Sequence, residues 1–306
     1  MKNKVIVAAI AATLIAGLAG PVSATPPKTL VIIDSGINSQ LDWVKSALVE
    51  EACFIEFGKC PNGQASMTGP GAASLSLRDA DKDKTFNHGT QMASVAVAVN
   101  PGVKIVAIRI VGMSDKGFAN TYRTNALIPA LDWVAANATR LNVGAVSISL
   151  GRAYSEAACP VEATLQSQIV ALKQNNVGVF IAAGNRSNPN KIDYPACIPE
   201  AIAVGATDIR YSQRGVTGWI YPVMPTSNGG PDLDLYVLGK YETITLNGRR
   251  ILAVGTSAAT VAVASKWTQS LSQGGTYDSL WSTIQGGFEN AYRSMKDVIQ
   301  KQYNLI

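Results

Sequence analysis

Short runs of apolar residues rich in Val and Ile recur along this sequence, and they constrain its fold more than any other feature. Helical patterns separate several of the runs. Continuous apolar runs are typical of strands buried on both faces, and their alternation with helices favours a parallel sheet. We therefore predict an α/β fold with a doubly wound, mostly parallel sheet and helices on both faces. The strands are expected at residues 29–33, 103–110, 143–150, 177–183, 201–206 and 233–238, and the helices at 89–99, 121–137 and 162–175.

The last third of the chain departs from this alternation. Residues 243–251 predict a short β-hairpin with Asn247 and Gly248 at its turn, and an alanine-rich helix is expected from Ser257. Apolar side chains recur every three or four residues over 281–303, which predicts a final helix whose apolar face packs on the core. Residues 61–76, rich in Gly, Pro and Ser, are expected to form a long surface loop.

The first 24 residues have the pattern of a secretory signal peptide. Lys2 and Lys4 supply positive charge, residues 5–20 are apolar, and residues 22–24 form a small-residue cleavage site. The apolar stretch is too short for an ordinary spanning helix, and no later uncharged apolar run approaches about 18 residues. We therefore predict a secreted or periplasmic protein with one domain over residues 25–306 and no membrane association after signal removal.

The number and placement of charged residues argue against a nucleic-acid partner. The chain has 26 basic and 21 acidic side chains, and removal of Lys2 and Lys4 leaves 24 against 21, a net charge of +3. The basic residues are scattered, without the runs interleaved with aromatic residues that a nucleic-acid surface needs. An apolar share of 47% also excludes a disordered chain. We expect no nucleic-acid partner.

Four cysteines, Cys53, Cys60, Cys159 and Cys197, lie in a chain addressed to an oxidising compartment, where disulfides persist. Two disulfides are therefore expected. The cysteine spacings lack the CxxC pairs of a zinc site, and His88 is the only histidine in the chain. These two features argue against a structural zinc site.

Three short motifs carry reactive side chains to strand ends or helix starts. Asp34 ends the first expected strand, His88 opens a helix, and Ser257 opens the alanine-rich helix. Each motif alone has an ordinary structural interpretation, as a turn, a core histidine or a helix cap. Together, in the order Asp, His, Ser, they supply a carboxylate, a base and a hydroxyl nucleophile, the groups needed for acyl transfer. Asn185, on a glycine turn after another strand, adds an amide that could stabilise an oxyanion.

With these motifs in place, the sequence resembles the subtilisin-like serine proteases, the subtilase family or peptidase S8. The resemblance spans nearly the whole mature chain. Its main motifs are residues 31–37 (VIIDSGI), 87–93 (NHGTQMA) and 255–259 (GTSAA). Further agreement comes from residues 146–151 (VSISLG), 181–185 (IAAGN), 194–206 (YPACIPEAIAVGA) and 227–236 (SNGGPDLDLY).

The resemblance implies a subtilisin-like fold and a serine endopeptidase acting on protein or peptide substrates. In that mechanism Asp34 orients His88, His88 is general base and then general acid, and Ser257 attacks the scissile carbonyl. Asn185 and the Ser257 amide form the oxyanion hole. The remaining implied substrate-binding residues are Ser149, Leu150 and Gly151, which pair with substrate as a strand, Gly117 and Phe118 on its other side, and Leu150, Ala182 and Gly184 around the side chain before the cut.

The family-like alignment also places Cys159 and Cys197 on either side of the substrate region. We therefore predict that Cys159 pairs with Cys197, and that Cys53 pairs with Cys60.

No cofactor is expected for this chemistry. Residues 79–83 alternate carboxylates as calcium loops do, but Lys84 stands where an EF-hand loop needs Gly, which favours a solvated loop beside His88. Subtilases often bind structural calcium, yet no calcium site carries over to residues of this chain. We expect a monomer.

Other protein classes fit less well. A catalytically silent subtilase fold acting as a binding or chaperone module is the main alternative. A nucleotide-binding protein would need GxGxxG or a P-loop after the first strand, and an esterase would need GxSxG, whereas residues 34–36 read DSG and residues 255–259 read GTSAA.

Overall fold

The computed structural model describes residues 26–284, except 77, 78, 80–82, 115, 117, 118, 121–123 and 213–217. The predicted signal peptide, Gly117 and Phe118, and the second part of the predicted final helix lie outside the described residues. A single domain over residues 25–306 therefore stays a prediction.

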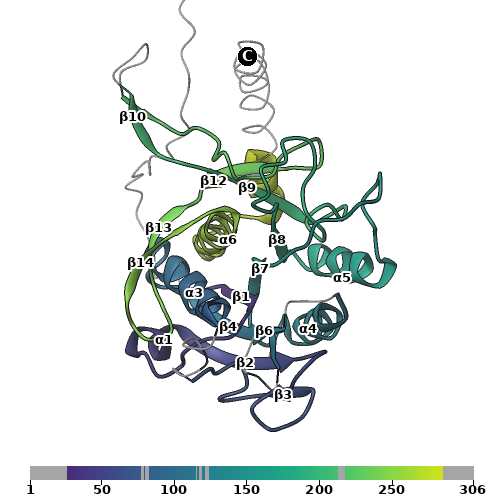
Figure 1. The fold of residues 1–306 in the computed structure, drawn as a ribbon, viewed down its shortest axis with the longest axis vertical. Coiled ribbons are helices and arrows are strands. Elements are labelled where there is room, and N and C mark those ends of the chain that lie inside the picture. The colour runs from purple at the N-terminus through teal and green to yellow at the C-terminus, as the bar shows by residue number, and fades with distance from the viewer. Residues whose placement is uncertain are drawn as a thin grey trace, which may run out of the picture.

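An eight-stranded sheet runs through the described part of the chain in the order β12-β9-β8-β7-β1-β4-β2-β3 (Figure 1). The six predicted strands all form, as β1 (Thr29–Asp34), β4 (Lys104–Arg109), β7 (Val143–Ile148), β8 (Gly178–Ala182), β9 (Ile202–Thr207) and β12 (Leu235–Leu238). Neighbouring strands are parallel except β2 (Leu48–Phe54) and β3 (Ser66–Thr68), which pair antiparallel. The sheet confirms the predicted α/β class. The prediction of a loop over residues 61–76 is wrong where β3 forms, because this segment extends the sheet through its pairing with β2.

Helices cover both faces of the sheet (Figure 1). Among the helices of the described residues are α1 (Asp42–Ala47), α3 (His88–Val99), α4 (Thr124–Asn137), α5 (Ala163–Gln174) and α6 (Thr256–Ser272). Alternate side chains of β1 enter two separate cores: Val31 and Ile33 pack with α4 and α5, whereas Leu30 and Ile32 pack with α3 and α6. This two-sided burial explains why the strand reads as a continuous apolar run.

Three hairpins and a short helix lie outside the central sheet in the described part of the chain. The predicted hairpin forms from β13 (Lys240–Ile244) and β14 (Arg250–Val254), and Gly248 adopts a φ of 80° at its turn. Two more hairpins are β5 (Gly112–Met113) with β6 (Ala119–Asn120), and β10 (Arg210–Ser212) with β11 (Gly218–Ile220). A helix over residues 277–284 forms the first part of the predicted final helix. Among the described residues, no helix has the length and apolar character needed to cross a membrane.

All four cysteines form the predicted disulfides, Cys53 with Cys60 and Cys159 with Cys197. The first closes the loop that follows β2, and the second ties the segment after β7 to the segment before β9. Both pairings predicted from the sequence are confirmed.

The strand order changes direction at the centre of the sheet. Strands β4 and β2 follow β1 on one side, whereas β7, β8, β9 and β12 lie on the other. Open parallel sheets bind ligands beyond the carboxyl ends of the strands at such a switch point. The ends of β1 and β7 therefore mark where a functional site should be sought.

Candidate active site

Asp34 is the last residue of β1 and lies at this switch point. Its side chain is buried, with 2% exposed, and its Oδ1 accepts a hydrogen bond from the Ser35 N–H at 2.6 Å. Ser35 Oγ in turn accepts the N–H of Gly89, in the first turn of α3, at 3.0 Å. These contacts tie the end of β1 to the start of α3.

His88 is the first residue of α3, and this junction brings its ring onto Asp34. His88 Nδ1 lies 2.9 Å from both Oδ1 and Oδ2 of Asp34. The His88 side chain is 27% exposed, so its other edge can reach a ligand from solvent. Residues far apart in the sequence therefore form the carboxylate and imidazole pair that the sequence predicts.

Two opposing effects set the protonation of His88. Burial disfavours the cation and alone would lower the pKa of His88, but the charge of Asp34 and the hydrogen bond to it favour the cation. The pKa of His88 is raised above its ordinary value of 6.5 as a result. Sequence alone shows neither the burial of His88 nor its contact with Asp34, so the direction of this pKa shift follows only from the structure.

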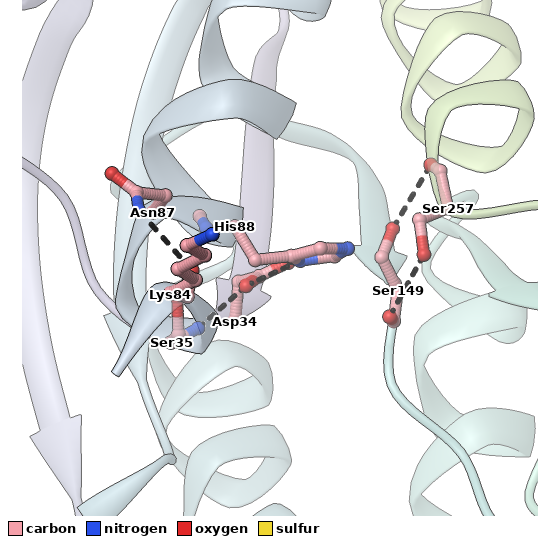
Figure 2. A network of polar contacts seen from close by, with 8 residues as sticks. Asp34, Ser35, Lys84, Asn87, His88, Ser149 and Ser257 are labelled. Carbon is pink, nitrogen blue, oxygen red and sulfur yellow. Dashed lines mark hydrogen bonds and ion pairs between the residues drawn. The ribbon is translucent and has the colours of Figure 1, made fainter. Parts of the chain in front are cut away.

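Ser257 lies in the first turn of α6, on the other side of the switch point. Its Oγ donates to the carbonyl oxygen of Ser149 at 3.2 Å, and Ser149 Oγ donates to the carbonyl of Ser257 at 3.1 Å. Figure 2 shows the His88 ring pointing from Asp34 toward this pair of serines. No hydrogen bond joins His88 to Ser257 among the described residues, and the serine hydroxyl bonds the Ser149 carbonyl instead.

Asn185 follows β8 and lies beside the start of α6. Its Oδ1 accepts the N–H of Thr256 at 3.0 Å, and its Nδ2 has no partner among the described residues. Gly255 precedes α6 with a φ of 132°, and a Cβ there would lie 2.7 Å from Asn185 Oδ1, so only glycine fits. The contact leaves an exposed amide donor next to Ser257.

The residues implied for substrate binding are placed unevenly. Ser149 is buried against Ser257, Leu150 is half-buried and Gly151 is exposed, so the chain reaches the surface directly after β7. Ala182 is buried in β8, and the side of Gly184 where a Cβ would lie is filled by Asp193 and Asn228. A pocket formed by Leu150, Ala182 and Gly184 stays a prediction.

Sequence reasoning missed the residues that hold this site in place. Ser35, Asp193 and Asn228 all contact segments that carry predicted catalytic residues. Asn228 lies in residues 227–236, one of the segments that carry the family resemblance, which was a signal, but no local pattern indicates its partners.

The described acidic residues near His88 do not fit a calcium site. Asp79 Oδ2 accepts the N–H and the hydroxyl of Ser76, and Asp83 accepts the N–H groups of Thr85 and Ala119. These carboxylates are occupied by protein donors, three of them in local turns and one, the Ala119 N–H, in β6. Within the described ranges, no group of three or more His, Cys, Asp or Glu residues could hold a metal ion.

Comparisons with known proteins extend this picture. The sequence model described as the subtilase family (Peptidase_S8) matches residues 28–297. The chain is 29% identical over 191 residues to alkaline serine exoprotease A of Vibrio alginolyticus, a match covering 61% of this chain and 31% of that protein. It is 27% identical over 224 residues to a cuticle-degrading serine protease of Arthrobotrys oligospora, covering 72% and 47%. The matches thus span less than half the length of these two curated relatives.

Solved structures share the fold. A cold-adapted subtilisin-like serine proteinase superposes with a TM-score of 0.59 at 24% identity, covering 84% of this chain and 81% of that one. Sphericase superposes with a TM-score of 0.62 at 19% identity, covering 87% and 85%. At these identities the superpositions establish the architecture of the chain.

Proposed function

This chain belongs to the subtilase family, and from that premise we propose that it is a serine endopeptidase acting through Asp34, His88 and Ser257. The observation that carries the proposal is the contact of His88 Nδ1 with both carboxylate oxygens of Asp34 at 2.9 Å. This contact holds Nδ1 as a donor, so the neutral ring presents Nε2 as an acceptor. An acceptor at Nε2 is what a serine nucleophile requires.

Catalysis begins when the Ser257 hydroxyl leaves the Ser149 carbonyl and turns to His88 Nε2. His88 takes the proton as Ser257 Oγ bonds to the scissile carbonyl carbon, and Asp34 stabilises the resulting cation. His88 then gives this proton to the leaving amine, and the C–N bond breaks. Water then attacks the acyl carbon while His88 takes its proton. His88 gives this proton to Ser257 Oγ as the bond between Oγ and the acyl carbon breaks, which restores Ser257.

The negative charge on the tetrahedral intermediate would be bound by Asn185 Nδ2 and the Ser257 N–H. Two features support this assignment. Asn185 Oδ1 is already bonded to Thr256, so the amide presents its donor side. The N-cap residue of α6, Gly255, has no side chain to bond the next N–H group, which leaves the Ser257 N–H and the helix dipole available for an anion.

The substrate we propose is a protein or peptide that lies extended along Ser149, Leu150 and Gly151, with Gly117 and Phe118 on its other side. The side groups of the site supply every proton transfer, so the proposed reaction needs no cofactor. The signal-like first 24 residues and two disulfides support a secreted or periplasmic enzyme. We propose that it acts as a monomer.

One observation favours the alternative of a catalytically silent binding or chaperone module. The reciprocal hydrogen bonds of Ser149 and Ser257 occupy the nucleophile. In a silent protein this arrangement would persist in the presence of substrate.

A fluorophosphonate probe followed by casein separates the two functions. We expect the purified mature chain to be labelled at Ser257 and to cleave casein, and we expect Ser257→Ala to lose both properties. Ser272→Ala, which removes another hydroxyl from the same helix, should retain both. Absence of labelling and cleavage in the unaltered chain would support the binding module.

A further inference from the structure

Asn228 is a buried asparagine that the proposed reaction does not use. It lies between β11 and β12 and has no exposed surface. Its Nδ2 donates to the Ala183 carbonyl and to Asp193 Oδ1, both at 3.0 Å, and its Oδ1 accepts the N–H groups of Arg186 at 2.9 Å and Asn188 at 3.1 Å. Three of these four bonds therefore go to the backbone of residues 183–188, which carry Asn185.

The orientation of the Asn228 amide is fixed by the chemistry of its partners. Both partners of Nδ2 are oxygens that can only accept, and both partners of Oδ1 are backbone groups that can only donate. A flipped amide would lose all four bonds. Asp193 is itself buried, and its Oδ2 is held by Arg186 Nε at 3.1 Å.

The turn that these bonds hold has little packing of its own. The side chains of Asn185, Arg186 and Ser187 are exposed. Gly184 has a φ of 100°, and a Cβ there would lie within 2.5 Å of both Asp193 and Asn228, so no side chain can anchor this position. The Asn228 N–H adds a bond to the Gly184 carbonyl at 2.9 Å. The position of the turn therefore depends on hydrogen bonds. Asn228 makes four of them, and bonds from the Ser187 N–H to the Thr226 carbonyl and from the Gly229 N–H to the Asn188 carbonyl add two more.

The turn must be placed accurately because a donor stabilises an oxyanion only within a narrow range of distance and angle. Asn185 reaches α6 through one hydrogen bond of its side chain, from the Thr256 N–H to its Oδ1. A shift of the turn would break this bond and move Nδ2 away from Ser257.

We propose that Asn228, oriented by Asp193, is a positioning residue that holds the turn of Asn185 so that its amide faces the reacting carbonyl. This inference rests on the proposed function and adds a residue to its machinery. Asn228 contacts neither Ser257 nor His88 among the described residues, so it acts through Asn185 alone.

A double-mutant cycle tests this dependence. Asn228→Ala should lower kcat by about 10- to 100-fold with little change in KM, as expected for a misplaced transition-state donor. In the Asn185→Ala background the same change should alter kcat by no more than about twofold. Asp193→Asn keeps the size of the side chain and should give a smaller loss with the same dependence on Asn185. Asn100→Ala, which removes another buried asparagine at the end of α3, should leave kcat unchanged.

Amide hydrogen exchange supplies a readout that does not need activity. In the Ser257→Ala background, which prevents self-cleavage, Asn228→Ala should make the Thr256 amide exchange about tenfold faster, the effect of losing one hydrogen bond. Asn185→Ala should have the same effect, and the two changes together should add nothing further.

An equal loss of kcat in both backgrounds would overturn the positioning role, and so would unchanged exchange at Thr256 in a folded Asn228→Ala protein. If the unaltered chain hydrolyses no peptide, the proposed function fails, but exchange at Thr256 still decides whether Asn228 positions Asn185.

Discussion

Replacement of Asp34 by Asn tests how the carboxylate controls His88. Asp34 Oδ1 accepts the Ser35 N–H at 2.6 Å, so an asparagine here must keep its oxygen at that position. Its Nδ2 then takes the place of Oδ2, which lies 2.9 Å from His88 Nδ1. Oδ1 also lies 2.9 Å from Nδ1, but Nδ2 can only donate, so the asparagine favours the ring tautomer in which Nδ1 accepts and the proton of the neutral ring is on Nε2. The base then faces Ser257 with a proton already in place.

The expected loss follows from this change of tautomer. Removal of the orienting carboxylate in a serine protease triad lowers kcat by about 10⁴, which is about 5 kcal/mol of transition-state stabilisation. The pKa of His88 should also fall, because the charge of Asp34 that raises it is gone while the burial that lowers it remains. The unaltered enzyme should therefore gain kcat/KM with one proton's slope and a midpoint above 6.5, as His88 loses its proton.

Both effects can be measured on the same samples. Since His88 is the only histidine in the chain, one imidazole signal in an NMR titration reports its pKa and tautomer without assignment. Asp234→Asn is a matched control, because Asp234 is another poorly exposed carboxylate whose Oδ2 bonds Ala203 away from the site. An unchanged pKa of His88 in Asp34→Asn, or a loss in kcat below tenfold, would refute the reasoning.

Four further outcomes are expected. Asn185→Ala should lower kcat by about 10² to 10³ without raising KM, the range known from subtilisin itself; an effect on KM alone would make Asn185 a substrate contact. A disulfide restricts the unfolded chain more when it closes a longer loop, so loss of Cys159–Cys197, with a separation of 38 residues, should lower the free energy of unfolding in urea by about 4 kcal/mol. Loss of Cys53–Cys60, with a separation of 7, should lower it by about 2 kcal/mol. Equal losses would contradict this dependence on loop length. Burial raises the pKa of Asp234 to about 6, so its contribution to stability is present below about pH 4 and is lost as the pH rises through 6. Asp234→Asn should remove this pH dependence, which changes the free energy of unfolding by at most about 3 kcal/mol. Diethylpyrocarbonate should inactivate the enzyme in proportion to one modified histidine, and full activity after modification of His88 would exclude the triad.

The central strands could be predicted because strands buried on both faces have a local pattern of continuous apolar residues. Strands such as β1 and β7 are covered by helices on both faces, and this requires continuous apolar runs. Strand β2 was missed because Glu50 and Glu51 interrupt its apolar pattern. Glu51 is buried nonetheless, since its Oε1 accepts the hydroxyl of Ser74, and no local pattern reveals a partner 23 residues away.

The residues of the proposed triad could be named from the sequence, but the residues that support them could not. Short motifs carry the carboxylate of Asp34, the imidazole of His88 and the hydroxyl of Ser257, and these groups in this order indicate acyl transfer. Asn228 bonds residues about 40 positions away, and its role depends on three-dimensional contacts. The direction of the His88 pKa shift also needed the structure, because burial and the charge of Asp34 oppose each other.

The resting bond between Ser257 and Ser149 does not weigh strongly against catalysis. A neutral hydrogen bond of this kind contributes about 1 kcal/mol net. It therefore lowers the fraction of molecules whose Ser257 hydroxyl is free to bond His88 by about tenfold at most. The bond from Ser257 to His88 Nε2 replaces it with one of similar strength. In free enzymes such catalytic bonds are often long and tighten only when substrate is bound. Since Ser149 also begins the segment proposed to pair with substrate, occupation of that segment is the event expected to release the Ser257 hydroxyl toward His88.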